Sequence, residues 1–395
     1  MEEEIKNNLL LEINKLKAPE GYLKAGYPNY FTLFGRDSLI SSWQMIEIDP
    51  TIAKNTLKIL AKYQGKITNN KSEEEPGKIL HEYRFKLKDQ LALPHWQFPY
   101  FGSIDSTPLF VIVAEKYFEK TNDKDFILQI WDNVISALNW LSVYGDPDQD
   151  HFIEYKRKNP YGLFHQGWRD NLEDHLRITP PVAIVEVQGY AYAAYKAGIK
   201  LAGYFTNDDF LKELWTEKAN ALKEKFHKSF WWEEESYYYL ALDKNKNPRK
   251  SVSSNPGRLL FSGIVPKGAM QKLVKRLFKD DIFTPYGIRT LSENDPDFDY
   301  LSYHLGSIWP HDNWVIYYSL KQSGFLNEAE QVKQGLLSAY KKLGYIPELF
   351  AVKNNKIIPL SKGARQYERK TKNVIKPNSL QAWSACGLLN MIWED

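Results

Sequence analysis

Amphipathic segments with helical periodicity recur in pairs along the whole sequence, and this recurrence constrains the fold more than any other feature. At residues 49–65, Asp49 and Pro50 form a typical helix start. Ile52 and Leu60 then fall on one helical face. The same periodicity is found at residues 2–16, 36–48, 106–121, 125–145, 181–205, 208–230, 266–279, 306–323, 325–343 and 377–393.

The helical pairs are joined by long loops that are rich in polar and aromatic residues. These loops cover residues 26–38, 94–106, 161–171, 302–313 and 343–350. Loops held by a rigid scaffold often carry function, and their spacing of one helical pair indicates a helical barrel with one loop-lined mouth. The pairs share no repeated sequence, which argues against a tetratricopeptide or HEAT array. No linker divides the chain, so we expect one domain over residues 1–395.

Other patterns agree with an all-α chain. Strand-like alternation is confined to residues 236–243 and 357–360. The single cysteine, Cys386, lies in an apolar helical pattern and cannot form an internal disulfide. Residues 1–10 lack the basic and apolar regions of a secretory signal, and no apolar run approaches the ~18 residues of a membrane span. A cytoplasmic protein without a membrane partner is therefore expected.

Composition excludes some functions and favours others. The net charge is only +3, and basic residues are interleaved with acidic ones, so no nucleic-acid partner is expected. Aromatic residues make up 14% of the chain. Such rings suit half-wet sites, including clefts that bind sugars, although a large core also uses them. Nucleotide-binding and nucleophile-elbow motifs are lacking, so neither an organic cofactor nor a nucleophilic serine is expected.

Several loop residues allow both a structural and a functional interpretation. Arg36 and Asp37 could start a helix or bind neighbouring sugar hydroxyls, and Asp105 could cap the helix that follows it. His311 and Asp312 enter an apolar helical pattern, where polar residues need partners. They offer too few ligands for a zinc or iron centre, so no metal is predicted there.

A short acidic turn resembles the start of a calcium-binding loop. Asp146, Asp148 and Asp150 alternate as in an EF-hand, but the sixth position is His151 rather than glycine and the twelfth is Arg157 rather than glutamate. The EF-hand template therefore fails. A solvated turn is predicted, and the sequence leaves open whether this turn binds an ion.

Two carboxylates stand out as a candidate catalytic pair. Glu348 lies between Pro347 and Leu349, which is unlike a solvated surface. Asp170 lies in the charged loop sequence HQGWRDNLED. Two acids on opposite loops facing one cleft are what glycoside hydrolysis requires: one protonates the leaving oxygen, and the other activates water or attacks the sugar.

Eight sequence blocks carry a family resemblance, in order from about residue 30 to the C-terminus: FGRDSLI, PGKILHEYR, YFGSIDSTPLF, HQGWRDN, EVQGYAYAA, SYHLGSIWPHDN, PELF and SLQAW. The chain resembles the amylo-α-1,6-glucosidase domain of glycogen-debranching enzymes, within the (α/α)6-barrel inverting glycosidases that include glucoamylases. This resemblance implies an all-α, six-hairpin (α/α)6 barrel and no cofactor.

The resemblance also implies roles for individual residues. The aspartate two positions after the loop tryptophan, Asp170, would be the general acid, and the glutamate of the Pro-Glu-Leu block, Glu348, the general base. Arg36 and Asp37 would hold the terminal glucose. The further residues implied to line or support this subsite are Asp105, Trp168, Glu186, Gln188, Trp309, His311 and Asp312.

The implied activity is the exo-acting, inverting release of terminal glucose from α-glucosides, α-1,6-linked above all, in an oligosaccharide or α-glucan. Many bacterial relatives carry asparagine where this chain has His165. Relatives usually carry an N-terminal β-rich domain as well, and eukaryotic debranching enzymes a transferase domain; neither is expected in this sequence. A short oligosaccharide or another α-glycoside is then expected. Alternatives are trehalase-like or mannosylglycerate-hydrolase-like activity, a sugar epimerase or isomerase using His304 and His311, and a sugar-binding barrel without activity.

Overall fold

The computed structural model describes residues 2–206, 209–366 and 374–393, and helices make up its framework. The helices are α1 (Glu2–Leu16), α2 (Gly35–Met45), α3 (Pro50–Lys62), α4 (Leu87–Leu91), α5 (Ser106–Thr121), α6 (Lys124–Gln129), α7 (Trp131–Val143), α8 (Val185–Phe205), α9 (Asp209–Phe230), the 3-10 helix η1 (Asn255–Ser262), α10 (Lys267–Leu277), α11 (Pro310–Gln322), α12 (Leu326–Leu343) and α13 (Ala382–Trp393).

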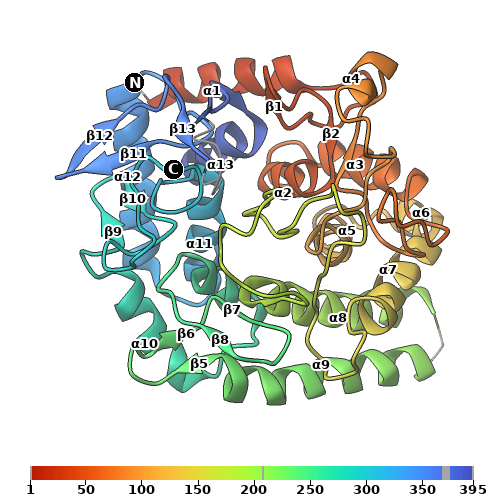
Figure 1. Cartoon of the computed structure of the whole chain (residues 1–395). Helices are drawn as coiled ribbons and strands as arrows, with labels where there is room; N and C mark the ends of the chain where they lie inside the picture. Colours follow the sequence, from red (N-terminus) through yellow and green to blue (C-terminus); the bar gives the residue numbers. More distant parts are fainter. Residues whose placement is uncertain (1, 207–208, 367–373, 394–395) are drawn as a thin grey trace.

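Six of these elements form a closed inner ring. Going around it, α2 packs on α5, then come α8, η1, α11 and α13, and α13 packs back on α2. The outer helices α1, α3, α7, α9, α10 and α12 pack against this ring (Figure 1). The predicted (α/α)6 barrel is confirmed.

Burial separates the inner helices from the outer ones. The outer helix α9 buries one stripe, which includes Trp215, Ala219, Leu222 and Phe226, as expected for a helix with solvent on its other side. The inner helix α13 is buried on nearly all sides, Cys386 included. Apolar residues all round a helix are typical of such a fully enclosed position.

The helix boundaries differ from the sequence prediction in informative places. The segment at 125–145 is two helices, α6 and α7, and the segments predicted from 306 and 377 begin at Pro310 and Ala382. Residue 208, the predicted start of α9, lies outside the described residues. The inner element η1 was missed because its eight residues, with Gly257 among them, are too short to show a helical period.

The strands are short connectors rather than a layer of the fold. They are β1 (Gly26–Tyr27), β2 (Leu33–Phe34), β3 (Glu82–Tyr83), β4 (Ala183–Ile184), β5 (Trp231–Trp232), β6 (Tyr237–Tyr238), β7 (Ala241–Leu242), β8 (Pro248–Arg249), β9 (Phe283–Thr284), β10 (Gly287–Ile288), β11 (Ala351–Lys353), β12 (Lys356–Ile358), β13 (Ala364–Arg365), β14 (Val374–Ile375) and β15 (Leu380–Gln381).

These strands pair antiparallel, and some pairs join distant parts of the chain, as β1 does with β15. For example, β4, β7 and β8 form a three-stranded sheet in which Ala241 of β7 lies opposite both Ile184 and Arg249. The predicted strand at 236–243 contains β6 and β7, and the one at 357–360 overlaps β12.

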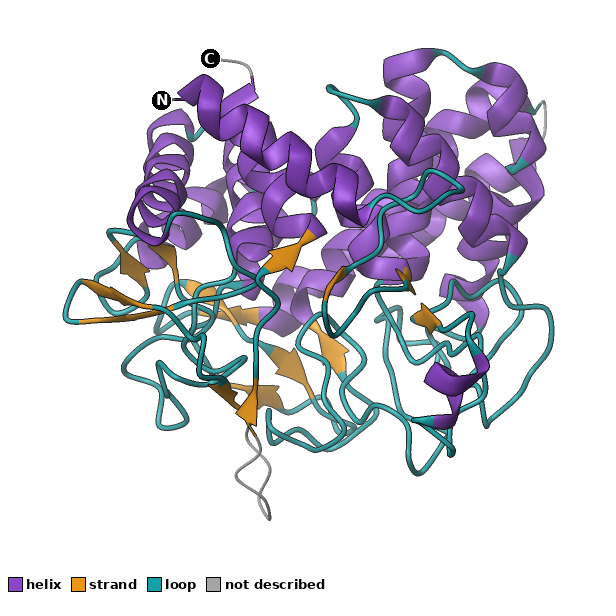
Figure 2. Ribbon diagram, turned by 90° about the horizontal axis from the view of Figure 1, so that it is seen from above, coloured by secondary structure: helices purple, strands orange, loops and turns teal. Residues whose placement is uncertain are grey.

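Most strands and loops gather on one side of the barrel, and the helices lie on the other (Figure 2). Strands β2, β4 and β15 run directly into the inner helices α2, α8 and α13. The first residues of these inner helices therefore lie at the loop side. Within the described part of the chain, no helix combines the length and hydropathy that crossing a membrane requires.

One side chain links three inner helices where the ring closes. Asn390 of α13 accepts a hydrogen bond from the Trp314 indole of α11 at 2.8 Å and donates one to the Gln44 carbonyl of α2 at 2.9 Å. The Trp314 indole N–H and the Gln44 carbonyl are polar groups, and leaving either of them buried without a hydrogen bond destabilises the folded protein.

We predict that Asn390→Leu lowers the free energy of unfolding by about 1–3 kcal/mol for each group left unpaired. Urea denaturation followed by circular dichroism measures this. The matched control is Asn220→Leu on the exposed face of α9, which should leave stability nearly unchanged. Equal stability of the two variants would contradict the bracing role of Asn390.

Candidate active site

A cavity of about 210 Å³ opens at the loop side of the barrel. It is lined by six of the residues predicted from the sequence, namely Arg36, Asp37, Trp168, Asp170, Trp309 and Glu348. They come from the starts of inner helices and from the loops before them. The structure thus brings the two candidate catalytic acids into one cavity, although 178 positions separate them in the sequence.

Arg36, in the first turn of α2, joins three parts of the site. Its Nε donates to Asp105 Oδ2 at 2.7 Å, its Nη1 to Asp170 Oδ2 at 2.8 Å, and its Nη2 to the Gly167 carbonyl at 2.9 Å. The guanidinium is buried. Removing one partner of such a buried pair costs about 3–5 kcal/mol, so the loop carrying Asp170 is held firmly against α2 and α5.

Asp105 does not act as the helix cap that its position suggested. It precedes α5, but its side chain accepts no hydrogen bond from the first turn of that helix. Instead it pairs with Arg36, and its second oxygen accepts a hydrogen bond from the Ser103 hydroxyl at 2.8 Å. Asp105 does not line the cavity; it sets the position of the guanidinium that does.

Opposing influences set the protonation of Asp170. Burial raises the pKa of this carboxyl, the Arg36 guanidinium lowers it, and the negative charge of Asp105 raises it. Burial wins, so the pKa of Asp170 lies above its ordinary value. The side chain keeps 30% of its surface exposed toward the cavity. A group bound there would displace water from this carboxyl and add to the desolvation.

Glu348 is buried and held by two donors. The Tyr303 hydroxyl donates to its Oε1 at 2.6 Å, and the backbone N–H of Asn378 donates to its Oε2 at 2.6 Å. Both bonds favour the ionised carboxylate, but burial outweighs them and Asp170 adds repulsion, which raises the pKa of Glu348 to about 7. The two acids therefore sense each other's charge.

Asp37 adds a third carboxyl to the cavity. Burial raises its pKa well above the ordinary value, Arg36 opposes this, and the charges of Asp170 and Glu348 increase it. Gln381 donates to Asp37 Oδ1 at 3.2 Å. Glu82 lines the cavity as well, so four acids share one small space with Arg36, which favours protonation of part of this group near neutral pH.

Aromatic rings form much of the cavity wall. Trp168 meets Trp309 edge to face at 5.7 Å, and the Arg258 guanidinium lies 4.4 Å from the centre of the Trp168 ring. Trp309 stacks on His304 at 5.3 Å. Rigid rings of this kind can pack against the C–H face of a sugar.

Sequence analysis did not single out several other residues that line the cavity. Those with rings or charges are Tyr30, Phe34, His81, Glu82, Arg84, Trp96, Tyr303 and Trp383. Most of them lie inside the loops and sequence blocks described above, and their polar or aromatic character was the signal in the sequence that could have identified them. Which of these face the cavity depends on loop conformation, which periodicity does not reveal.

Two predicted subsite residues are buried beneath the cavity wall. Asp312 accepts a hydrogen bond from Arg258 Nε at 2.6 Å, and His311 Nε2 lies 3.1 Å from Arg258 Nη2. His311 also stacks on Trp383 at 3.7 Å between ring centroids. Neither residue lines the cavity. Both support rings that do.

Glu186 and Gln188, near the start of α8, are also buried away from the cavity lining. Glu186 accepts a hydrogen bond from Asn255 of η1 at 2.8 Å. Gln188 bonds to both the N–H and the carbonyl of Ile153, at 2.9 and 2.8 Å. They fix neighbouring segments of the chain, and their predicted part in the sugar subsite stays a prediction.

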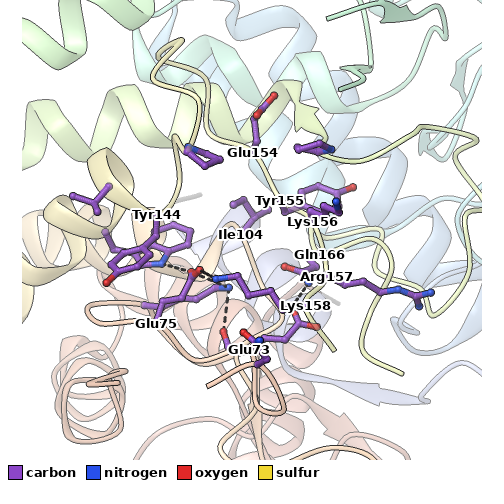
Figure 3. Close-up of a pocket in the computed structure, with 16 residues that line it drawn as sticks. Glu73, Glu75, Ile104, Tyr144, Glu154, Tyr155, Lys156, Arg157, Lys158 and Gln166 are labelled. Carbon is purple, nitrogen blue, oxygen red and sulfur yellow. Dashed lines mark hydrogen bonds and ion pairs between the residues drawn. The ribbon is translucent and has the colours of Figure 1, made fainter. Parts of the chain in front are cut away.

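A larger cavity of about 640 Å³ lies beside the first, and Figure 3 shows its lining. Its acids are already paired: Glu75 lies 3.6 Å from Lys78 and contacts Lys158, and Glu73 accepts a hydrogen bond from Gln166 at 2.6 Å. This pairing leaves it a poorer candidate for acid–base chemistry than the smaller cavity, despite its size.

The comparisons with known proteins agree with a carbohydrate-active site. A family model described as the mannosylglycerate hydrolase MGH1-like glycoside hydrolase domain matches residues 30–368. The chain belongs to this glycoside hydrolase family. No curated protein gives a significant match.

Solved structures share the fold at low identity. The GH63 mannosylglycerate hydrolase from Thermus thermophilus in complex with Tris has a TM-score of 0.75 and 15% identity, over 99% of this chain and 100% of that one. Its complex with Tris and D-glycerate has a TM-score of 0.72 and 14% identity, with the same coverage. A rhamnosidase from Klebsiella oxytoca with rhamnose bound has a TM-score of 0.65 and 13% identity, over 98% of this chain and 62% of that one.

These matches refine the resemblance seen in the sequence. The glycoside hydrolase assignment and the barrel are confirmed, but the matching family is the MGH1-like group and not specifically the amylo-α-1,6-glucosidase domain. Glycogen debranching is not supported.

The hydrogen bond from the Tyr303 hydroxyl leads to a prediction about the pKa of Glu348. Replacing the hydroxyl in Tyr303→Phe removes a donor to the carboxylate, so the pKa of Glu348 should rise further above about 7. A titration followed by carbon NMR of protein labelled at glutamate carboxyls measures this, with Glu348→Gln identifying the signal.

The control for this titration is Tyr204→Phe, which changes an exposed ring and should leave that signal unmoved. A lower or unchanged Glu348 pKa in Tyr303→Phe would show that the hydroxyl does not stabilise the carboxylate.

Proposed function

We propose that the protein hydrolyses a small α-glycoside with inversion at the anomeric carbon, with Asp170 as general acid and Glu348 as general base. The observation that carries this proposal is that both acids line one small cavity, where the charge of Asp170 raises the pKa of Glu348. A carboxyl pair in one cleft is the machinery that glycosidases share. A cavity of about 210 Å³ suits the end of a short substrate better than the middle of a glucan chain.

Asp170 supplies the proton to the glycosidic oxygen. Its raised pKa favours the protonated form, and the sugar covers its exposed part and excludes water, which favours that form further. Arg36 holds the carboxyl in place through Nη1. When the glycosidic bond breaks, Asp170 is left as a carboxylate next to this guanidinium, which stabilises the new charge.

Glu348 activates the water that attacks the anomeric carbon from the opposite face. The Tyr303 hydroxyl and the Asn378 N–H favour its ionised form against the effect of burial, and they fix its direction. It accepts a proton as the oxygen–carbon bond forms. Inversion requires room for that water, which corresponds to carboxyl groups ~6.5–9.5 Å apart, against ~5 Å in a retaining pair.

The substrate proposed first is a sugar α-linked to a small anionic group, as in mannosylglycerate. The family description supports this choice. Arg84 lines the same cavity, and its side chain is 23% exposed, so its guanidinium can reach an anionic leaving group. Asp37 and the rings of Trp168 and Trp309 are assigned to the sugar.

Release of terminal α-1,6-linked glucose is the second candidate, and the GRDS, GWRD and PELF blocks favour it. The epimerase alternative is weaker, because His311 is buried between Arg258 and Trp383 and does not line the cavity with His304. A binding protein without activity would not require the two acids to share a cavity.

Mutation of the two acids tests the mechanism. Asp170→Asn and Glu348→Gln should each lower kcat by about 10²- to 10⁴-fold, since each removes one proton-transfer group. Glu173→Gln in the same loop is the matched control and should keep near-wild-type turnover. Circular dichroism should show that all three variants stay folded, although Asp170→Asn lowers Tm because it weakens the ion pair with Arg36. Near-wild-type kcat in either acid variant would overturn the assignment.

The product's anomeric form tests inversion separately. Proton NMR during the first minutes of hydrolysis of an α-glycoside should show the β-anomer of the released sugar. The α-anomer as the first product would instead indicate a retaining mechanism.

Arg84 tests the substrate class. Arg84→Met should raise KM for mannosylglycerate at least tenfold, while KM for a neutral aryl α-mannoside changes little, because only the first substrate carries an anion. A panel with isomaltose, panose, maltose and trehalose ranks the alternatives. Wild-type preference for isomaltose or panose over mannosylglycerate would favour the α-1,6-glucosidase candidate.

A further inference from the structure

The acidic turn that follows α7 is more ordered than a solvated turn. Carboxylate oxygens of Asp146, Asp148 and Asp150 lie within 4.8 Å of one another. Asp146 is only 2% exposed, and its Oδ1 is buried without a hydrogen-bond partner. An ionised oxygen in this state is costly unless a cation lies close to it.

A fourth acid completes the arrangement. Glu154 stands at the ninth position counted from Asp146 and is buried. Figure 3 shows its side chain directed away from Glu73 and Glu75 of the larger cavity. The first, third, fifth and ninth positions are the ones that supply side-chain ligands, directly or through water, early in a calcium loop.

The sixth position also has the conformation of a calcium loop without its usual residue. His151 has a φ of 78°, in the left-handed region that glycine normally occupies there. The EF-hand template failed at this position because it requires the residue to be glycine. The backbone at His151 nevertheless adopts the conformation that glycine has in a calcium loop.

A cation already lies among these acids. The Lys246 ammonium is 3.1 Å from Asp148 Oδ2 and 2.9 Å from Asp150 Oδ2, and it also contacts Glu154 Oε1. Burial lowers the pKa of Lys246, but these three carboxylates outweigh burial and raise it overall. Lys218 also acts on the turn, through its charge on Asp146.

We propose that this turn is a calcium-type site in which the ammonium of Lys246 takes the place of the metal, and that Ca²⁺ binds there once that ammonium is removed. Without that ammonium, the carboxylates of Asp148, Asp150 and Glu154 lose the cation that they share, and Asp146 lies beside the first two. Ca²⁺ is the divalent ion that suits this site, because it accepts six to eight oxygen ligands in irregular geometry, whereas Mg²⁺ demands a near-ideal octahedron. Water and backbone carbonyls supply the remaining ligands.

The Lys246 ammonium, in the place of a metal ion, has a structural role. Lys246 lies in the turn between β7 and β8, and β7 pairs with β4 at the start of α8. The acidic turn leads into the segment that continues to the Asp170 loop. An internal cation thus ties these two parts of the loop side together without depending on free calcium.

The test compares Lys246→Met, which keeps most of the stem but loses the charge, with the wild type. Isothermal titration with CaCl2 should show one bound Ca²⁺ in Lys246→Met and none in the wild type. Millimolar Ca²⁺ should raise Tm of the variant by several degrees relative to EGTA, while Tm of the wild type stays the same. Lys244→Met, in the same hairpin, is the matched control and should behave like the wild type.

Two further variants sharpen the outcome. Asp148→Asn combined with Lys246→Met should weaken Ca²⁺ binding at least tenfold, and Lys246→Arg should bind none because a cation is restored. If Lys246→Met is unstable, refolding it in Ca²⁺ against Mg²⁺ gives the answer: recovery in Ca²⁺ alone supports the proposal. No Ca²⁺ response in Lys246→Met, or equal Ca²⁺ affinity in the wild type, would overturn it.

Discussion

The buried guanidinium of Arg36 is the interaction on which the site depends. It binds Asp105 at the start of α5, Asp170 in the 161–171 loop and the Gly167 carbonyl, while it belongs to α2 itself. Two neighbouring inner helices and the loop that carries the candidate acid are thus fixed by one planar group. The packing of the barrel fixes where α2 and α5 begin. Through its hydrogen bonds, Arg36 then fixes the position of the 161–171 loop relative to these two helices.

The same group explains how several acids coexist in a small space. Asp37, Asp170 and Glu348 all have raised pKa values because burial disfavours their charged forms. The donors are distributed unequally: Arg36 stabilises Asp170, whereas Tyr303 and a backbone N–H stabilise Glu348. Different partners around chemically similar acids are what separates an acid role from a base role.

Periodicity and motif order were enough to predict the barrel and the acids that share its cavity, because they depend on local pattern and on residue type. The failures have physical causes. η1 is too short to show a period. Asp105 looks like a helix cap until the distant Arg36 is placed beside it. His151 adopts a glycine-like conformation. Only the Asp105 case depends on a contact between segments remote in sequence; the other two depend on local backbone conformation, which residue type did not reveal.

The division between a helical framework and a loop-lined face has an evolutionary consequence. Solved structures at 13–15% identity have the same framework, so the barrel forms although most of its residues differ. Mutations in the loops can reshape the cavity wall without disturbing the inner ring, as long as the few anchoring contacts survive. Such an arrangement lets a lineage exchange one sugar for another by small steps, each of which leaves a folded protein.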